Sequence, residues 1–129
     1  MPTNPAAAAC EVTGMTKTEV LALVAELKPH EHSDAVMLRW LEELEQKIAC
    51  EIHRKMPDGT LSTGSMGEQL AVPAPYDRVY WTYLVAMLDF VSGNLELFDR
   101  SNKLFGEAYG DYARFVQRQG NLAKHRRAR

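Results

Sequence analysis

The stretch that decides the fold is residues 78–118, RVYWTYLVAMLDFVSGNLELFDRSNKLFGEAYGDYARFVQR. Its apolar side chains recur at intervals of three and four residues, which is the period of an α-helix and not of a β-strand. Ser92, Gly93 and Asn94 interrupt the pattern with turn chemistry, in which the glycine ends one helix and the asparagine caps the next. We therefore predict two helices joined by a short turn.

Both helices carry apolar stripes. In the first, we expect a buried stripe of Val79, Tyr83, Ala86, Met87 and Phe90. The second has a heptad-like seam with a polar residue in its middle: Leu95, Phe98, Asn102, Phe105, Tyr109, Tyr112 and Val116. A second stripe flanks this seam: Leu97, Leu104, Ala108 and Phe115. Two stripes on one helix predict two contact faces.

Two further helices are predicted upstream. Thr16 and Glu19 have the spacing of a capping box, and Pro29 stops the helix that they begin. Ser33 caps a longer helix, which the turn residues 57–59 end. The apolar stripe of this longer helix is Met37, Leu41, Leu44, Ile48, Ile52 and Met56.

Residues 60–72 form a polar connection containing glycine and serine, and it is long for a link between helices. Pro73 and Pro75 then bracket the start of the next helix, and we place Pro75 at its first position, where the missing N–H is not needed. Residues 1–14 are rich in proline and alanine and are expected to form a disordered leader.

These elements predict an all-α, four-helix bundle-like domain over residues 15–119, with flexible termini at 1–14 and 120–129. The apolar surface exceeds what one small bundle can bury, so we expect another subunit to cover part of it. The candidate interface residues are Trp40, Trp81, Leu97, Asn102, Leu104 and Phe115. For the two tryptophans a core position is the usual alternative, and for Asn102 a helix-face amide.

The charge is distributed unevenly along the 129 residues. The formal net charge is −2, but residues 1–119 hold 11 basic and 17 acidic residues and so carry about −6. The cations at the C-terminal end are Lys124, Arg126, Arg127 and Arg129. This basic end is either a solvated terminus or a docking tail for an acidic protein surface or nucleic acid.

No constellation of reactive side chains points to catalysis. His30 with His32, and Cys50 with His53, each supply two ligands where zinc needs three or four. Ser65 lacks the flanking pattern and the preceding strand of a nucleophile elbow. We expect neither enzymatic activity nor a cofactor or metal. The two cysteines make no disulfide framework.

Three stretches resemble a family of small helical proteins, the head–tail connectors (adaptors) of tailed phages and prophages. Residues 15–29 resemble the opening helix with its Leu-Lys-Pro stop, and residues 39–44 the second-helix signature. The third stretch begins with Val72, Pro73, Ala74, Pro75, Tyr76 and Asp77 and continues through residue 112. The resemblance covers residues 15–118, and the chain departs from the family pattern at residues 99–101 and at Gly106.

This resemblance implies a structural virion protein of the neck, assembled in the bacterial host cytoplasm. Such a subunit is expected to form a dodecameric ring beneath the portal protein, to receive a stopper or tail protein, and to continue the channel for genomic double-stranded DNA without binding it specifically. The basic end is then a candidate portal-docking tail. The alternative is a small helical phage regulator or DNA-binding accessory protein whose basic end contacts phosphates.

Overall fold

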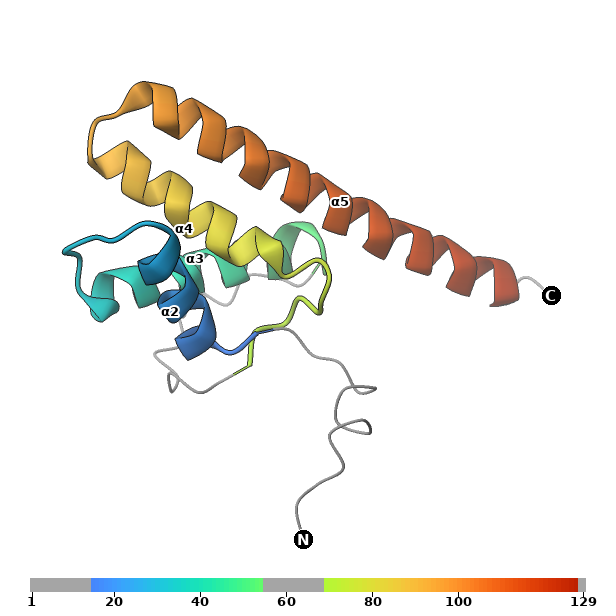
Figure 1. Cartoon of the computed structure of the whole chain (residues 1–129). Coiled ribbons are helices and arrows are strands. Elements are labelled where there is room, and N and C mark those ends of the chain that lie inside the picture. Colours follow the sequence, from blue (N-terminus) through green and yellow to red (C-terminus); the bar gives the residue numbers. More distant parts are fainter. Residues whose placement is uncertain (1–14, 55–68, 128–129) are drawn as a thin grey trace, which may run out of the picture.

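The computed structural model of the chain describes residues 15–54 and 69–127, with side chains as far as Leu122. In these ranges the chain forms α2 (Lys17–Leu27), α3 (Asp34–Glu51), α4 (Arg78–Val91) and α5 (Leu95–Arg127), with no strand (Figure 1). The predicted all-α architecture is confirmed. The expected leader, residues 1–14, lies outside the described residues, as do residues 60–68 of the predicted connection.

Three of the four predicted helix starts are confirmed by their capping bonds. Thr16 Oγ1 accepts from the Glu19 N–H at 3.2 Å, and the Glu19 carboxylate accepts from the Thr16 N–H at 2.9 Å, which completes the capping box. Ser33 Oγ caps α3 by accepting from the Val36 N–H at 3.3 Å. Asn94 Oδ1 caps α5 by accepting from the Leu97 N–H at 3.1 Å. These bonds satisfy N–H groups that have no partner inside the helix.

The turn between α4 and α5 also follows the prediction. Gly93 has φ +79°, a left-handed conformation that costs an L side chain energy and glycine almost none. The Gly93 N–H bonds the Phe90 carbonyl at 3.1 Å, so the chain reverses within three residues of the end of α4. A tight reversal brings α4 and α5 together as an antiparallel hairpin (Figure 1).

The end of α3 was predicted wrongly. The helix ends at Glu51 and does not continue to the turn residues 57–59. The His53 N–H bonds the Ile48 carbonyl at 3.0 Å, and Arg54 takes φ +59°, the left-handed conformation common after a helix C-terminus. The cause is tertiary, because His53 Nε2 lies 2.8 Å from the Tyr112 hydroxyl of α5. Met56 lies outside the described residues.

The start of α4 also differs from the prediction. The helix begins at Arg78, so Pro75 does not occupy its first position but lies in a turn before it, after a cis peptide bond. The Tyr76 N–H bonds the Pro73 carbonyl at 2.9 Å, and the Tyr76 ring stacks on Phe115 at 4.7 Å between centroids. Contact with α5 therefore holds this segment as a turn before the helix can begin.

α4 is buried on more than one face, whereas a single stripe was predicted. Tyr80, Leu84 and Leu88 are at most 2% exposed and were not in the predicted stripe. Phe90, which was predicted to be buried, is 55% exposed. The reason is position: α2 and α3 pack on α4 from one side and α5 from another (Figure 1), so little of its circumference faces solvent.

The described end of the predicted connection, residues 69–72, packs against the core and is not a polar link. Leu70 and Val72 are at most 3% exposed, and the Leu70 N–H bonds the Met15 carbonyl at 3.1 Å beside an isolated Thr16–Gln69 bridge. Their two-residue spacing is that of an extended chain, which presents alternate side chains to one side. The predicted connection therefore ends in a short core-packed segment.

A hydrogen-bonded network joins this segment to α3 and α4. The Tyr80 hydroxyl donates to Glu45 Oε1 at 2.6 Å and accepts from the Val72 N–H at 2.8 Å, while Glu45 Oε2 accepts from the Ala71 N–H at 3.0 Å. Burial, followed by the Glu45 charge, raises the pKa of Tyr80 far above its usual range. The phenol therefore remains a neutral donor at any physiological pH.

Two ion pairs hold α2 to the other helices. Lys17, at the start of α2, bonds Glu42 of α3 at 3.3 Å, and both side chains are almost fully buried. Lys28, which follows α2, pairs with the buried Asp89 of α4, and Asp89 also accepts from the Ser101 hydroxyl of α5. A buried carboxylate needs such partners, since an unpaired one is costly.

Tyr80→Phe tests the network. Removing the hydroxyl leaves the Val72 N–H and one Glu45 oxygen without their partner, and a buried unpaired polar group costs about 1–3 kcal/mol. We expect the free energy of unfolding in urea to fall by about 2 kcal/mol. Tyr83→Phe is the control, because Tyr83 lies half-buried in the same helix and its change should stay within about 0.5 kcal/mol. Equal effects of the two substitutions would contradict the network's role.

Candidate subunit-contact surfaces

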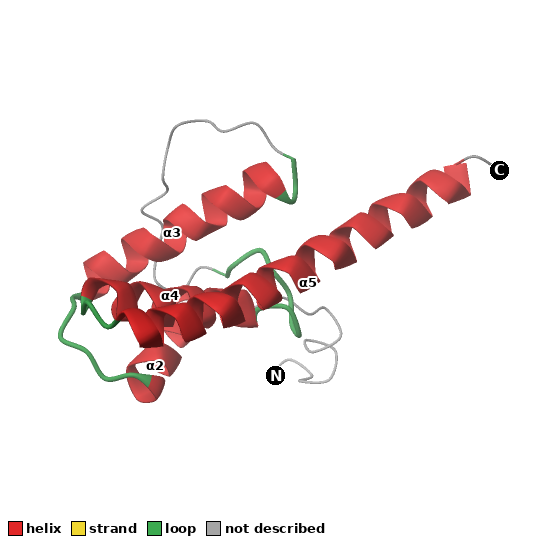
Figure 2. Ribbon diagram, turned by 90° about the horizontal axis from the view of Figure 1, so that it is seen from above, coloured by secondary structure: helices red, strands yellow, loops and turns green. Residues whose placement is uncertain are grey.

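α5 extends well beyond the rest of the fold. Its 33 residues span about 50 Å at 1.5 Å per residue, against about 21 Å for the 14 residues of α4. Figure 2 shows the C-terminal part of α5 running past the other helices. We call residues 117–127 the arm. Helix α5 continues without a break across the boundary expected at residues 119 and 120.

The core-facing side of α5 combines one member of each predicted stripe, Tyr112 of the seam and Ala108 of the second stripe, with Ser101, which was in neither. Ser101, Ala108 and Tyr112 are its buried residues, with exposed fractions of 7%, 3% and 4%. Two of the three are small, which allows α4 and α5 to approach closely. Other members of the stripes flank this side: Phe105, Tyr109 and Val116 of the seam are partly covered, whereas Leu97 and Leu104 of the second stripe are 38% and 50% exposed.

The six candidate interface residues fall into two groups. Leu97, Asn102 and Leu104 are exposed on α5, where a second subunit can reach them. Trp40, Trp81 and Phe115 are half-buried and pack against the core. The Trp40 ring lies 5.9 Å from that of His32, and Phe115 stacks on Tyr76. The structure therefore does not gather the six into one patch, and their interface role stays a prediction.

The predicted basic end is helical for most of its length. Lys124, Arg126 and Arg127 belong to the last two turns of α5, while Arg129 lies outside the described residues. The backbone of α5 carries these three positions to the far end of the arm, beyond the other helices. Cations also suit a helix C-terminus because they oppose its dipole.

The motif of Pro73, Pro75, Tyr76 and Asp77 is a turn that packs against α5. Tyr76 contacts the Tyr112 ring at 5.8 Å as well as Phe115. Asp77 precedes α4 but makes no side-chain capping bond. Burial is the main reason that the pKa of Asp77 is raised. The role of the motif is structural, because it places the start of α4 against the middle of α5.

The most exposed apolar side chains lie where α4 gives way to α5. Phe90, Val91 and Leu95 are 55%, 46% and 66% exposed, and we call these three residues the tip. The Phe90 ring packs on Phe98 at 5.3 Å between centroids. Periodicity placed Phe90 in a buried stripe and Leu95 in the seam of the last helix, but the hairpin carries both past the end of the core. A cluster of large exposed apolar side chains is typical of a contact site.

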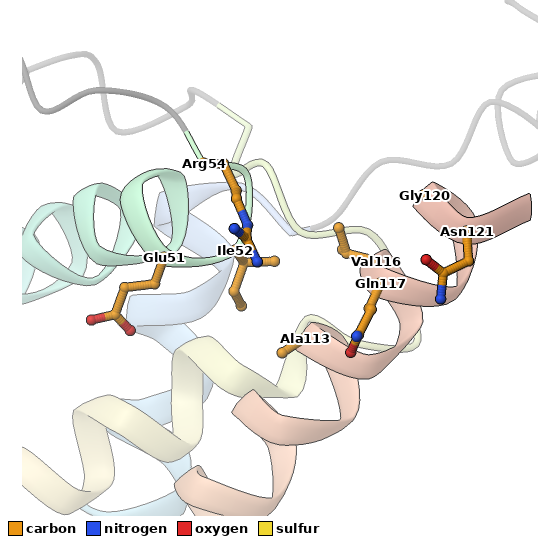
Figure 3. A pocket seen from close by; sticks show the side chains of 8 residues that line it. All are labelled: Glu51, Ile52, Arg54, Ala113, Val116, Gln117, Gly120 and Asn121. Carbon is orange, nitrogen blue, oxygen red and sulfur yellow. The ribbon is translucent and has the colours of Figure 1, made fainter. Parts of the chain in front are cut away.

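A cleft of about 490 Å³ lies between the end of α3 and the outer part of α5. We call it the arm cleft. Ile52 and Arg54 face Ala113 and Gln117 across it (Figure 3). Its full lining is Glu51, Ile52, Arg54, Ala113, Val116, Gln117, Gly120 and Asn121. The sequence gives no direct signal for this cleft, because its two walls lie about 60 residues apart in the chain.

Hydrogen bonds fix the charge state at the inner edge of the cleft. The Tyr109 hydroxyl donates to the Glu51 carboxylate, which also accepts from Lys47 at 3.0 Å. The bond from Tyr109, and then that from Lys47, holds the pKa of Glu51 below its ordinary value of 4.5. A lowered folded-state pKa means that this stabilisation is present above pH 4.5 and is lost as the pH falls through the folded value.

The paired metal-ligand candidates remain pairs. His30 and His32 have ring centroids 5.8 Å apart, and His30 Nδ1 accepts from the His32 N–H at 3.0 Å. His53, one turn from Cys50, meets Tyr112 instead. Over residues 15–54 and 69–122, no three side chains of His, Cys, Asp or Glu gather as a metal site would require.

Comparison with protein-family models, with curated proteins and with solved structures finds no match to this chain. The likeness to phage connectors therefore rests on the sequence motifs alone. In the described part of the chain, no helix combines the length and the apolar character needed to cross a bilayer.

Gly106→Ala tests whether α5 is a continuous helix. Gly106 lies inside α5, and a Cβ there meets no atom within 4 Å. Since glycine in a helix interior costs about 1 kcal/mol relative to alanine, we expect the unfolding free energy in urea to rise by roughly that amount. Gly93→Ala is the matched control, and it should destabilise because Gly93 has φ +79°. A loss of stability in Gly106→Ala would indicate a bend or a contact at that position.

Proposed function

We propose that this protein is a structural subunit of the phage neck, a head–tail connector or adaptor that forms a ring between the portal protein and the tail or stopper. In this role it assembles in the bacterial host cytoplasm and ends in the virion. The ring continues the channel through which genomic double-stranded DNA passes. The protein acts by assembly and not by catalysis.

The observation that carries the proposal is the shape of α5 together with its exposed side chains. A small all-α body presents one helix of about 50 Å, with the apolar tip near one end and the arm at the other. Such surfaces at opposite ends suit an assembly built from repeated head-to-tail contacts. The three motif stretches over residues 15–118 give the same interpretation from the sequence.

The charge distribution also supports the proposal. Residues 1–119 carry a formal charge of about −6, and an acidic wall repels the phosphate backbone of DNA. A channel needs such a surface, because DNA must pass through it without sticking. The basic arm, by contrast, suits an acidic surface on the portal protein, and a helical arm can reach that surface beyond the body.

A particle analysis tests the role itself. We expect mass spectrometry of DNA-filled particles from the induced bacterial host to find this protein in near-stoichiometric ratio to the portal protein. Its presence only in the particle-free lysate would refute the connector function. Empty heads from a tail-deficient mutant serve as a control, since a subunit bound directly to the portal should remain with them.

Removing the basic end tests the docking role of the arm. We expect replacement of Lys124, Arg126, Arg127 and Arg129 by serine to weaken binding to the purified portal protein by about tenfold or more at low salt. The reason is that four cations are lost from a surface whose contacts are mainly electrostatic. The affinity of the unchanged protein should likewise fall as salt is added, because salt screens exposed charges.

Two other cations provide the matched control. Arg39→Ser combined with Arg78→Ser removes exposed positive charge from α3 and α4, and it should leave portal affinity within about twofold if position and not net charge matters. Unchanged affinity in the basic-end variant would remove the portal-docking proposal.

The alternative is a small helical regulator or DNA-binding accessory protein of the phage, and the cluster of cations at the arm's end favours it. It predicts duplex binding whose affinity falls steeply with salt, because counterions are released from the phosphates. The connector predicts little binding at physiological salt. Fluorescence anisotropy with a labelled duplex across a salt series separates the two.

A further inference from the structure

The outer end of α5 lies outside the packed body of the protein. α5 packs on α4, and no described side chain beyond Val116 belongs to the core. Every side chain of residues 117–122 is exposed. The arm cleft, and not packed side chains, lies between this stretch and the end of α3 (Figure 3). The stretch therefore lacks the tertiary packing that supplies most of the stability of helices in proteins.

The sequence of the arm adds little helical stability of its own. Gly120 lies inside it, and glycine is the least favourable residue in a helix apart from proline. A Cβ at Gly120 meets no atom within 4 Å, so no close contact requires glycine at this position. Residues 117–127 contain no carboxylate, so no ion pair between neighbouring turns supports them.

Gly120 marks the point at which the helix becomes unfavourable to extend. The arm continues a helix that is already formed, so it needs no nucleation, and each further residue is close to the balance between helix and coil. Gln117, Arg118 and Gln119 are good helix formers beside the packed part. Gly120 and Asn121, which follow, are poor ones. Unwinding from the C-terminal end should therefore stop at Gly120.

We infer that α5 consists of two units of separate stability. Residues 95–119 fold with the body, and residues 120–127 unwind and reform at Gly120 while the body stays folded. Unwinding lengthens this end from about 12 Å as a helix to at most about 27 Å as an extended chain. The boundary expected between residues 119 and 120 is then one of stability and not of secondary structure. The basic end thereby searches a larger volume than a rigid helix allows, which favours encounter with an acidic partner.

Amide hydrogen exchange of the full-length protein measures the two stabilities separately. We expect the amides of residues 121–127 to be protected less than about tenfold, because the free energy of opening them is near zero. The amides of residues 101–112 should be protected at least about a thousandfold, since they open only when the body unfolds. Arm amides as strongly protected as those of residues 101–112 would overturn the inference.

Two glycines of α5 form a matched pair for the next test. Gly106 and Gly120 are both exposed, and a Cβ at either meets no atom within 4 Å. Gly120→Ala should raise the protection of residues 121–127 by up to about fivefold, which corresponds to the cost of glycine in a helix of about 1 kcal/mol. It should leave the urea midpoint of the body unchanged.

Gly106→Ala should do the reverse. The urea midpoint should rise, and the protection of residues 121–127 should stay within about twofold of that of the unchanged protein. If Gly120→Ala raised the urea midpoint as much as Gly106→Ala does, α5 would unfold as one unit and the inference would fail.

A proline at the same position tests the independence of the body. Proline inside a helix removes a backbone hydrogen bond and clashes with the preceding turn. Gly120→Pro should reduce the protection of residues 121–127 to that of an unstructured chain, with no change in the urea midpoint. A lowered midpoint would contradict the inference, because the body would then depend on the arm.

Spin labels measure the change in reach. Nitroxides at Ala22→Cys, exposed on α2, and His125→Cys are placed in a Cys10→Ser, Cys50→Ala background. We expect a broad distribution of distances between the two labels, which narrows when Gly120→Ala is added and the helical arm becomes more populated. An equally narrow distribution with glycine and with alanine at position 120 would show a rigid arm.

The inference goes beyond the neck role and does not depend on it. Each measurement uses the purified protein and needs no phage particle or partner. A separately unwinding arm in a protein absent from particles would refute the neck role and leave the inference standing. A protein found at portal stoichiometry whose arm is fully protected in solution would refute the inference and leave the neck role standing.

Discussion

The hydroxyl of Tyr80 is the point on which the arrangement of the helices depends. It bonds Glu45 of α3 and the backbone of Val72 at once, and it does so from a helix that is buried on several faces. The position of α4 is thereby set against both α3 and the 69–72 segment. Because the turn at Gly93 is tight, setting α4 also sets α5. The direction of the arm therefore follows from contacts made near the start of α4, at the end of that helix away from the Gly93 turn.

Local capping signals in the sequence predicted three of the helix starts, whereas tertiary contacts decided the end of α3 and the start of α4. Thr16, Ser33 and Asn94 are short-range capping residues, so their partners lie within three positions and can be identified from the sequence. The end of α3 depends on His53 meeting Tyr112, 59 residues away, and the turn before α4 depends on Tyr76 meeting Phe115. No local sequence pattern reveals contacts between residues so far apart in the chain, which is why both boundaries were misplaced.

The contact surfaces likewise divide into those that the sequence indicates and one that only tertiary contacts create. Net charge along the chain showed the basic end directly, since charge is a property of composition. Periodicity predicted two contact faces on α5, but it assigned Phe90 of α4 to the interior, where the structure leaves it exposed. A stripe gives the direction of a side chain around a helix and not how far along the helix the core extends. The arm cleft could not be foreseen, because it exists only where Ile52 and Val116 are brought together.

α5 has an acid near its start and cations near its end, and this order of charges affects the stability of the helix itself. Acids near an N-terminus and cations near a C-terminus stabilise any helix through its dipole, by about 0.3–1 kcal/mol each, so Glu96 and the basic end would be favourable in an isolated subunit. That effect is confined to the terminal turns. It does not explain Arg118, which lies more than two turns before the end, or the exposed apolar residues Phe90 and Leu95, which gain nothing from a dipole. The dipole therefore accounts for the charges in the terminal turns of α5 and not for the exposed apolar side chains of the tip, whose burial needs a contact beyond those of the described helices.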